Sequence, residues 1–293
     1  MPVDLDSLQQ TIDTRLIAIN QLMSTYIQDS ELSLFNQAPS QHPYTLSPET
    51  ALVVTEALRL GKLSNKTLDV TVGPLVNLWG FGPTKRPETI PTQAQIDAAM
   101  ALSGLDKLSI NGMLLTKSVD NLYLDLSTIA KGYGVDAIAE ILIASKLTDF
   151  LVEIGGEMRV AGTKQNGQAW RIAIEKPVSE SRTVQKIISV GDNAVATSGD
   201  YRNYYEEDGI RYSHLIDPTT GYPIQHNTVS ATVVHPSSMT ADGLATAMMV
   251  LSAKEAQALA EAESIALLLI LKEGDMFVEY QSPAFSQMVT IIN

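Results

Sequence analysis

The amino-acid sequence predicts an α+β fold of mixed sheets with flanking helices, formed as one compact domain over residues 1–293. Three observations support this class. Strand-like segments occur in runs with helices between them and do not alternate regularly with helices, as a doubly wound sheet requires. No internal repeat or linker divides the chain, and 45% hydrophobic residues against 18% charged residues suffice for a substantial core. Two intimately packed subdomains with the site between them are the alternative at this length.

In the first third of the chain, apolar spacing predicts two helices. The first helix covers Leu5–Tyr26, where apolar residues three and four apart mark one buried face: Leu5, Leu8, Ile12, Leu16, Ile19 and Leu22. The second covers Ser47–Leu60, from a Ser-Pro-Glu-Thr start to the residue before Gly61. We expect a strand at Leu68–Val72, followed by a glycine-rich loop that ends at Pro83. The aromatic residues of this loop, Trp79 and Phe81, predict either a pocket rim or a core plug.

From Tyr123 onward the pattern favours strands with helices between them. A short strand at Tyr123–Leu126 leads into a helix over Ile129–Ile143, with Ser127 or Thr128 as its N-cap. Further helices are expected at Thr240–Leu251 and Ala253–Ala262. The remaining strands are expected at Phe150–Ile154, Met158–Ala161, Trp170–Glu175, Lys186–Val190, Val229–Val234, Ile265–Leu271 and Met276–Tyr280, the last two joined by a hairpin-like turn.

Composition excludes several classes of function. The formal net charge of −13 argues against a nucleic-acid partner, because clustered Lys and Arg supply most of such affinity. The chain has no cysteine, which excludes thiol catalysis, zinc–thiolate sites and disulfides. The longest apolar run, Ile265–Leu271, is too short to span a bilayer. Residues 1–6 lack the features of a signal peptide, so we expect any export signal or lipid-anchor cysteine to have been removed.

Two short segments carry candidate ligand-binding groups. Asp125 ends a predicted strand, and Lys131 lies in the first turn of the helix that follows, where free N–H groups favour a phosphate. An ordinary capping sequence is the alternative. Asp242 and Thr246 are four residues apart on a predicted helix, so both oxygens face the same side and suit Mg²⁺. The alternative here is a first-turn carboxylate and a Thr that bonds back to its own helix.

The remaining signals are weak when taken singly. His214 follows a predicted short strand, where a histidine serves either as a hydrogen-bonded core residue or as a catalytic base. The pair Gly155-Gly156 either lets a ligand approach the backbone closely or marks a bulge. The sequence contains neither a Rossmann G-x-G-x-x-G nor a Walker A loop.

Taken together and in order, these segments resemble the bacterial flavin transferase family often called ApbE. The resemblance covers about residues 24 to 250, and the joint occurrence of its motifs is highly specific. It rests on Ser24-Thr25-Tyr26, Ser33 to Asn36, Leu68 to Gly82, Asp125 to Thr128 with Lys131 to Tyr133, Ile154 to Glu157, Thr197 to Arg202, Tyr212 to Pro218 with Thr220-Gly221, and Ala241 to Thr246.

The resemblance implies two groups of site residues. Contacts to FAD are implied for Tyr26, Thr67, Leu68, Asp69, Asp125, Lys131 and Ile216. A Mg²⁺ site is implied at Thr128, Asp242 and Thr246. Two departures qualify these expectations. Many members have a Thr-Met-Gly-Thr strand before the first helix, and this chain starts after that point. Some relatives place a carboxylate where Ala245 stands, so we expect the metal shell here to rely more on backbone oxygens and water.

The implied activity is that of a Mg²⁺-dependent FAD:protein FMN transferase, which attaches FMN through a phosphoester bond to a Thr or Ser of a target protein and releases AMP. The expected catalytic residues are His214, which accepts the proton of the hydroxyl, and Asp242; Asp217 or a metal-bound oxygen is the alternative base. An FAD pyrophosphatase that yields FMN and AMP, and a non-catalytic FAD-binding protein, remain open.

The resemblance also implies a partner and a location. The target segment has the form Asp-x-x-Ser/Thr-Gly-Ala-Ser/Thr, which this chain lacks, so we expect modification of another protein. Membrane subunits of the Na⁺-translocating NADH:quinone oxidoreductase or of Rnf type are the expected targets. The expected location is the periplasmic side of the bacterial inner membrane, as a lipoprotein, although the signal and the lipidated cysteine are absent from this sequence.

Overall fold

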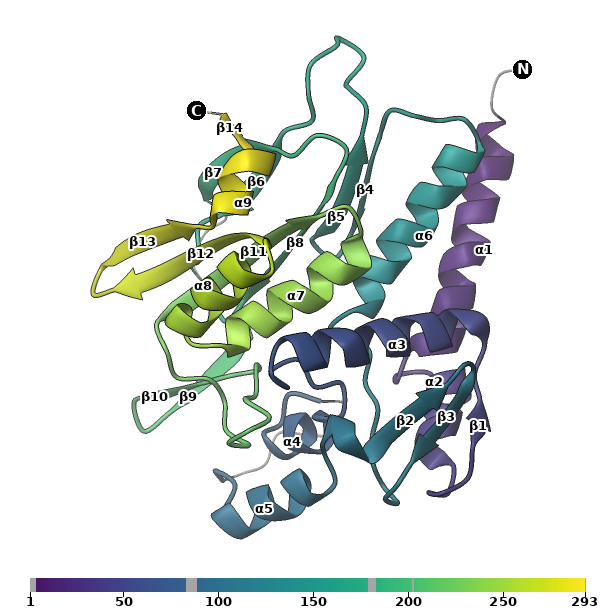
Figure 1. Cartoon of the computed structure of the whole chain (residues 1–293), viewed down its shortest axis with the longest axis vertical. Helices are drawn as coiled ribbons and strands as arrows, with labels where there is room; N and C mark the ends of the chain where they lie inside the picture. The colour runs from purple at the N-terminus through teal and green to yellow at the C-terminus, as the bar shows by residue number, and fades with distance from the viewer. Residues whose placement is uncertain (1–3, 83–88, 179–182, 202, 293) are drawn as a thin grey trace. The chain divides into compact units, whose positions relative to one another are not determined.

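The computed structural model describes residues 4–82, 89–178, 183–201 and 203–292, and it confirms the predicted α+β class (Figure 1). Contacts between Cα atoms group the chain into two compact units. The first unit comprises Met1–Arg15, Lys131–Asn203 and His226–Asn293; the second comprises Leu16–Ala130 and Tyr204–Gln225. Within the described ranges, no helix is both long enough and apolar enough to cross a bilayer.

The first unit contains two antiparallel sheets. The larger has the strand order β13-β12-β11-β8-β5-β4. Its strands are β4 (Phe150–Ile154), β5 (Glu157–Ala161), β8 (Ala194–Gly199), β11 (Thr228–His235), β12 (Ala266–Glu273) and β13 (Met276–Gln281). The smaller sheet has the order β14-β7-β6 and consists of β6 (Ile172–Glu175), β7 (Val184–Ser189) and β14 (Thr290–Ile292).

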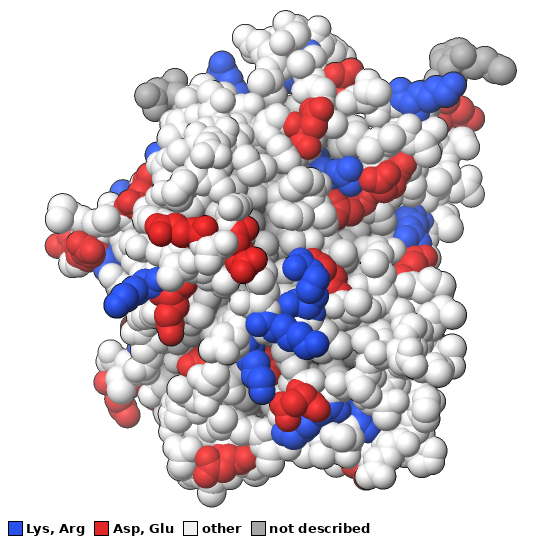
Figure 2. Space-filling model, viewed as in Figure 1, with Lys and Arg blue, Asp and Glu red and all other residues white. Residues whose placement is uncertain are grey.

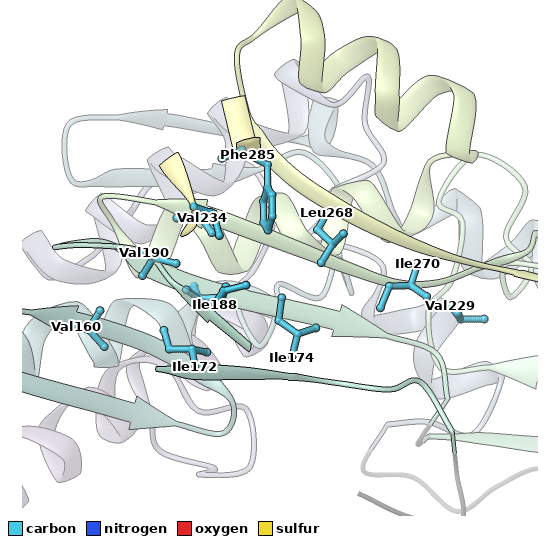
Figure 3. Packing of buried hydrophobic residues seen from close by; sticks show 13 residues of the cluster. Val160, Ile172, Ile174, Ile188, Val190, Val229, Val234, Leu268, Ile270 and Phe285 are labelled. Atoms are coloured by element: carbon cyan, nitrogen blue, oxygen red, sulfur yellow. The ribbon is translucent and has the colours of Figure 1, made fainter. Parts of the chain in front are cut away.

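A hydrophobic cluster joins these two sheets (Figure 3). Ile172 and Ile174 of β6 and Ile188 of β7 pack with Leu268 of β12, and Phe285 of helix α9 (Pro283–Met288) closes the cluster. All five side chains are almost fully excluded from solvent. Branched aliphatic side chains pack well on pleated surfaces, which explains why strand-forming residues dominate here.

The opposite face of the larger sheet is covered by helices. Figure 1 shows α7 (Ser238–Val250) and α8 (Ala253–Ala262) on this face. Val195 of β8 belongs to the hydrophobic cluster, so Ala194 and Ala196 point to the other side, where α7 packs. These small side chains let α7 lie close to the sheet. Every residue of α7 except Met239 is buried.

The second unit has shorter elements and its own core. Trp79 lies at the centre of this core, with Leu75, Ile96 and Tyr212 packed around it. Its helices are the C-terminal part of α1 (Leu5–Met23), α2 (Glu31–Gln37), α3 (Pro48–Leu63), α4 (Gly73–Leu78), α5 (Gln93–Ala101) and the short 3-10 helix η1 (Leu105–Lys107). Its strands are β1 (Tyr44–Thr45), β2 (Leu108–Asn111) and β3 (Leu114–Lys117) in one sheet, and the hairpin of β9 (Tyr204–Glu207) and β10 (Ile210–Ser213).

Two predicted strands are wrong. Leu68–Val72 forms a turn, because the Asp69 carboxylate accepts hydrogen bonds at Oδ1 from the Thr71 amide at 2.7 Å and the Thr71 hydroxyl at 2.5 Å. Such local bonds compete with a strand ladder. Tyr123–Leu126 forms no strand, and the amide of Asp125 donates to the carbonyl of Val70 in the turn at 2.8 Å.

Three details of the first two helices also differ from prediction. Helix α1 ends at Met23 and not at Tyr26, and Leu5 in its first turn is 71% exposed. Helix α3 continues past Gly61 to Leu63. A Cβ at Gly61 would lie 2.8 Å from the carbonyl oxygen of Leu68 and closer still to Leu105. This glycine therefore permits close packing and does not terminate the helix.

The other predicted elements are confirmed within a few residues. The bounds of β4 and α8 match the prediction, and helix α6 spans Ala130–Ala144. Trp79 is the core plug of the two alternatives, with 0% exposure and a bond from Nε1 to the carbonyl of Gly221 at 2.8 Å. Pro83, the predicted end of the glycine-rich loop, lies outside the described residues.

Charged side chains of both signs are interspersed on the face shown in Figure 2, where patches of Asp and Glu lie beside patches of Lys and Arg. Opposite charges at close range offset each other's far-reaching field. On this face, the acidic excess behind the net charge of −13 is therefore spread among basic residues.

Candidate active site

Helix α7 holds two of the predicted metal-binding residues. Its first turn is capped by Ser237, whose hydroxyl accepts a bond from the amide of Thr240 at 3.3 Å. Asp242 and Thr246 follow on the same side of the helix, and they are only 2% and 8% exposed. The Thr246 hydroxyl lies 3.3 Å from the hydroxyl of Ser198 on β8. The sheet and helix thus place a carboxylate and two hydroxyls on one side of α7.

The carboxylate of Asp242 is held by the start of α6. The amide of Gly132 donates to Asp242 Oδ2 at 3.0 Å, and Lys131 Nζ lies 3.5 Å from Oδ1. A Cβ at Gly132 would lie 2.8 Å from Asp242 Cβ and closer still to the carbonyl group of Ser238. Only glycine at this position lets the two helices approach so closely.

Lys131 joins two carboxylates. Its Nζ forms an ion pair with Glu157 Oε1 at 2.7 Å, besides the longer contact to Asp242. Burial alone would lower the pKa of Lys131, but Asp242 and Glu157 together raise it above its ordinary value. Burial and the charge of Glu157 together raise the pKa of Asp242 to about 7, against the opposing effect of Lys131. A bound cation at Asp242 would favour its ionised form.

The donor set of these residues fits Mg²⁺. Asp242 and Thr246 of the first unit offer hard oxygens. Thr128, the third predicted metal residue, belongs to the second unit, where its Oγ1 is buried without a hydrogen-bond partner among the described residues. In the part of the chain that the structure describes, no group of three or more His, Asp and Glu residues is placed to hold a metal ion. One carboxylate with hydroxyls leaves the remaining positions to water, backbone oxygens and phosphates, as Mg²⁺ usually has them.

The second unit holds most of the residues expected at FAD. Thr67 donates its hydroxyl to the carbonyl of Ser64 at 2.9 Å, Leu68 is buried, and Asp69 forms the turn described above. Burial raises the pKa of Asp69, while its bonds to Thr71 oppose the shift. These contacts give the segment a fixed shape.

Three further predicted FAD residues of this unit have different surroundings. Tyr26 is 76% exposed, which leaves its ring available for a contact with a ligand. Asp125 accepts the amide of Ser127 at Oδ1, at 2.9 Å, and so shapes the turn before α6. Ile216 is 5% exposed and packs in the core around Trp79.

His214 follows β10 directly and is half-buried. Its ring meets Phe81 edge-on with centroids 6.3 Å apart, and Phe81 stacks on Tyr205 at 5.4 Å. Tyr205 stacks in turn on Tyr212 at 5.3 Å. The β9–β10 hairpin and this row of rings therefore determine where the imidazole lies.

Asp217, the alternative base, is engaged in a turn. Its Oδ1 accepts the amide and the hydroxyl of Thr219 at 2.8 and 2.7 Å, and its Oδ2 accepts the hydroxyl of Thr220 at 3.1 Å. A carboxylate that holds its own turn in this way is poorly placed to accept a proton from a substrate. His214 remains the better candidate.

Sequence reasoning missed a carboxylate that supports α7. Asp136 of α6 accepts the Ser237 hydroxyl at 2.7 Å and the amides of Ser238 and Met239, each at 3.0 Å. Arg159 of β5 lies 3.2 Å from the same carboxylate. Asp136 is four residues after Gly132, which places both on one face of α6, and this spacing was the available signal. Glu157 was noted only as the residue after two glycines.

The first unit thus provides two buried carboxylates that share a partly exposed lysine, with hydroxyls beside them. This donor set suits an enzyme that handles phosphate groups with Mg²⁺. The family model described as the ApbE family matches residues 2–269. The chain therefore belongs to the ApbE family, as the sequence predicted.

Curated relatives support this assignment. The chain is 53% identical over 287 residues to the FAD:protein FMN transferase of Vibrio cholerae serotype O1, covering 98% of this chain and 86% of that protein. It is 45% identical over 282 residues to the FAD:protein FMN transferase of Salmonella typhimurium, covering 95% and 81%.

Solved structures agree with the fold. The flavin transferase ApbE from Vibrio cholerae superposes with a TM-score of 0.92 at 52% identity, covering 98% of this chain and 91% of the other. The apo form of the Pseudomonas stutzeri flavinyl transferase ApbE gives 0.89 at 40% identity, covering 98% and 89%.

Proposed function

We propose that this chain is a Mg²⁺-dependent FAD:protein FMN transferase, which joins FMN through a phosphoester bond to a Thr or Ser hydroxyl of a target protein. The observation that carries the proposal is the buried carboxylate of Asp242, held by the Gly132 amide and faced by Lys131. Two relatives that bear this name are 53% and 45% identical to the chain over 98% and 95% of its length, which supports the same chemistry.

The proposed reaction is a displacement at phosphorus. The oxygen of the target hydroxyl attacks the FMN phosphorus of FAD, the bond from that phosphorus to the AMP oxygen breaks, and AMP leaves. His214 accepts the proton of the hydroxyl. When bound, Mg²⁺ would neutralise the charge that gathers on the pyrophosphate. Thr128, Asp242 and Thr246 are the residues that would hold it.

The chain's other residues bind and orient FAD in this proposal. Lys131 supplies a positive charge to the phosphates, and its aliphatic stem packs beside Gly155. The further contacts to FAD are proposed for Tyr26, Thr67, Leu68, Asp69, Asp125 and Ile216. Targets carrying Asp-x-x-Ser/Thr-Gly-Ala-Ser/Thr, of the Na⁺-translocating NADH:quinone oxidoreductase or Rnf type, and a periplasmic location at the inner membrane are part of the same proposal, supported by the resemblance.

The test is an incubation with FAD, Mg²⁺ and a target domain that contains the Asp-x-x-Thr-Gly-Ala-Thr segment, followed by intact mass measurement. We expect the target to gain the mass of one FMN less one water, as formation of the phosphoester requires, and we expect EDTA or Asp242→Ala to abolish the addition. Asp97→Asn is the matched control, because Asp97 is an exposed acidic residue of α5. Its activity should equal that of the unchanged protein.

Two outcomes would contradict the proposal. Free FMN and AMP without modified target would mean that water replaces the hydroxyl and that the chain is an FAD pyrophosphatase. Intact FAD under every condition would mean that the chain binds FAD without reaction.

A further inference from the structure

Glu157 is a buried carboxylate with one unused oxygen. It opens β5, directly after Gly155 and Gly156, whose φ angles of 65° and 106° form a tight turn. Its side chain is 6% exposed, and Oε1 pairs with Lys131 at 2.7 Å. Oε2 is buried and has no hydrogen-bond partner among the residues that the structure describes.

Such an oxygen is costly to the folded chain. Glutamate is seldom buried unless its charge is fully paired, and a buried acceptor without a donor destabilises the folded chain. The same unit shows what a structural carboxylate looks like: both oxygens of Asp136 are occupied, Oδ1 by Ser238 and Arg159 and Oδ2 by Ser237 and Met239. Glu157 differs, because its Oε2 has no hydrogen-bond partner among the described residues.

The surroundings of Glu157 indicate the kind of partner. Lys131 is 44% exposed on its side chain, so the cluster opens to solvent at this residue. The turn at Gly155 and Gly156 is exposed, and a Cβ at Gly156 would meet nothing within 4 Å. The negative charge of Glu157 is already paired with the Lys131 ammonium at 2.7 Å, so Oε2 needs a hydrogen-bond donor and not a further positive charge. A neutral donor fits better.

We propose that Glu157 is a further substrate-binding residue, whose Oε2 accepts a hydrogen bond from a substrate hydroxyl next to the phosphates that Lys131 contacts. This inference rests on the proposed function, which brings two kinds of hydroxyl to this place. One kind belongs to the sugar and ribityl chain of FAD. The other is the Thr or Ser hydroxyl of the target protein.

The test is Glu157→Gln, measured for thermal stability, FAD affinity and FMN transfer. Gln keeps an amide oxygen that accepts from Lys131, but it removes the negative charge and replaces the second oxygen by an N–H₂ donor, while Asp242 still faces the Lys131 charge. A hydrogen bond to a charged group is typically worth about a 10- to 100-fold change in binding. If Oε2 binds a hydroxyl of FAD, we expect that loss in FAD affinity, measured by flavin fluorescence in the absence of target. If Oε2 binds the hydroxyl of the target protein, we expect unchanged FAD affinity and a loss of the same size in kcat/KM for the target.

Stability distinguishes a binding role from a structural role. If Oε2 serves substrate, the variant loses no internal contact of that oxygen, and its Tm should stay equal or rise. A fall in Tm that parallels the loss of binding would overturn the inference, as would unchanged affinity and transfer. Glu140→Gln is the control, because Glu140 of α6 is 63% exposed and pairs with Arg159, which lies in β5 as Glu157 does. It should leave all three measurements unchanged.

The same experiment separates this inference from the proposed function. If the protein without substitutions binds FAD but transfers no FMN, the transferase proposal is contradicted. The FAD affinity of Glu157→Gln then still decides the role of Oε2. In that case only a weaker FAD affinity supports the inference. An unchanged protein that binds no FAD overturns both.

Discussion

Replacing Gly132 by Ala tests the close approach of α6 and α7. The new Cβ would lie 2.8 Å from Asp242 Cβ and closer still to the backbone carbonyl of Ser238. The neighbour is backbone and cannot rotate away, so the helices must separate. The bond from the Gly132 amide to Asp242 Oδ2, now 3.0 Å, would then lengthen or break.

The expected cost follows from three contributions. Overpacking costs about 1–3 kcal/mol, and loss of a hydrogen bond to a charged group costs about 1.5–3 kcal/mol. Ala in place of Gly inside a helix returns about 0.5–1 kcal/mol. The sum is a loss of about 2–5 kcal/mol in the free energy of unfolding, or about 4–10 °C in Tm for a chain of this size. The proposed FMN transfer should fall with it, because Asp242 loses the bond from the Gly132 amide.

Calorimetry of Gly132→Ala against Gly134→Ala measures this effect. Gly134 lies in the same helix, and its Cβ would meet only the flexible Cδ1 of Ile154 at 3.3 Å. Gly134→Ala should therefore leave Tm nearly unchanged or raise it slightly. Equal Tm values for the two variants would refute the argument that Gly132 is required for contact between the helices.

Three further predictions concern charge, capping and exposure. Because the folded chain raises the pKa of Asp242 from 3.8 to about 7, it holds this proton more tightly than the unfolded chain does, and metal-free stability should fall as pH rises from about 4 to about 7. Thermal unfolding across this range should show the slope in the unchanged protein but not in Asp242→Asn; superimposable profiles would contradict it. Asp136→Asn should cost about 1–2 kcal/mol in urea unfolding, because it weakens the bonds at the start of α7, whereas Glu140→Gln should cost almost nothing. Tyr26→Ala should leave Tm unchanged, since the side chain is 76% exposed, yet weaken FAD binding measured by fluorescence; unaltered binding would remove Tyr26 from the site.

Regular periodicity made much of the first unit predictable from sequence. The bounds of β4 and α8 follow from apolar alternation and a Ser cap, and those of β12 and β13 are right within two residues. Strand β8 was missed because Ala194 to Gly199 consists of small residues, whose side chains give no alternating apolar pattern. The same small side chains allow α7 to pack closely on the sheet. They therefore remove the sequence signal of the strand and contribute to the fold.

Local side-chain bonds explain the errors in the second unit. Leu68–Val72 has the apolar alternation of a strand, but the carboxylate of Asp69 bonds to Thr71 and bends the chain. A periodicity argument counts Asp69 only as polar, and it cannot foresee which amide the side chain meets. The short strand next to His214 was predicted and is β10, but its partner β9 was missed. The two strands pair through residues that include Tyr205 and Tyr212, whose rings stack, and a single strand's pattern does not show this pairing.

The candidate site shows a different limit of sequence reasoning. Asp242 and Thr246 were found from their helical spacing, which depends on one element alone. Gly132 and Asp136 are also four apart, yet nothing in the sequence says that they meet the start of α7. Their importance arises only when two helices, far apart in the chain, come together.

The contacts between α6 and α7 imply that the position of Asp242 is set at two levels. The Gly132 amide holds the carboxylate directly, and Asp136 holds the helix that carries it by binding the amides at its start. The bond from Gly132 alone would still let α7 rotate about Asp242. The bonds to Asp136 alone would still let the Asp242 side chain rotate. Together they fix a buried carboxylate that faces Lys131. Burial disfavours its ionised form. A cation would find there a ligand that needs little rearrangement, which is the condition for tight binding by so few protein oxygens.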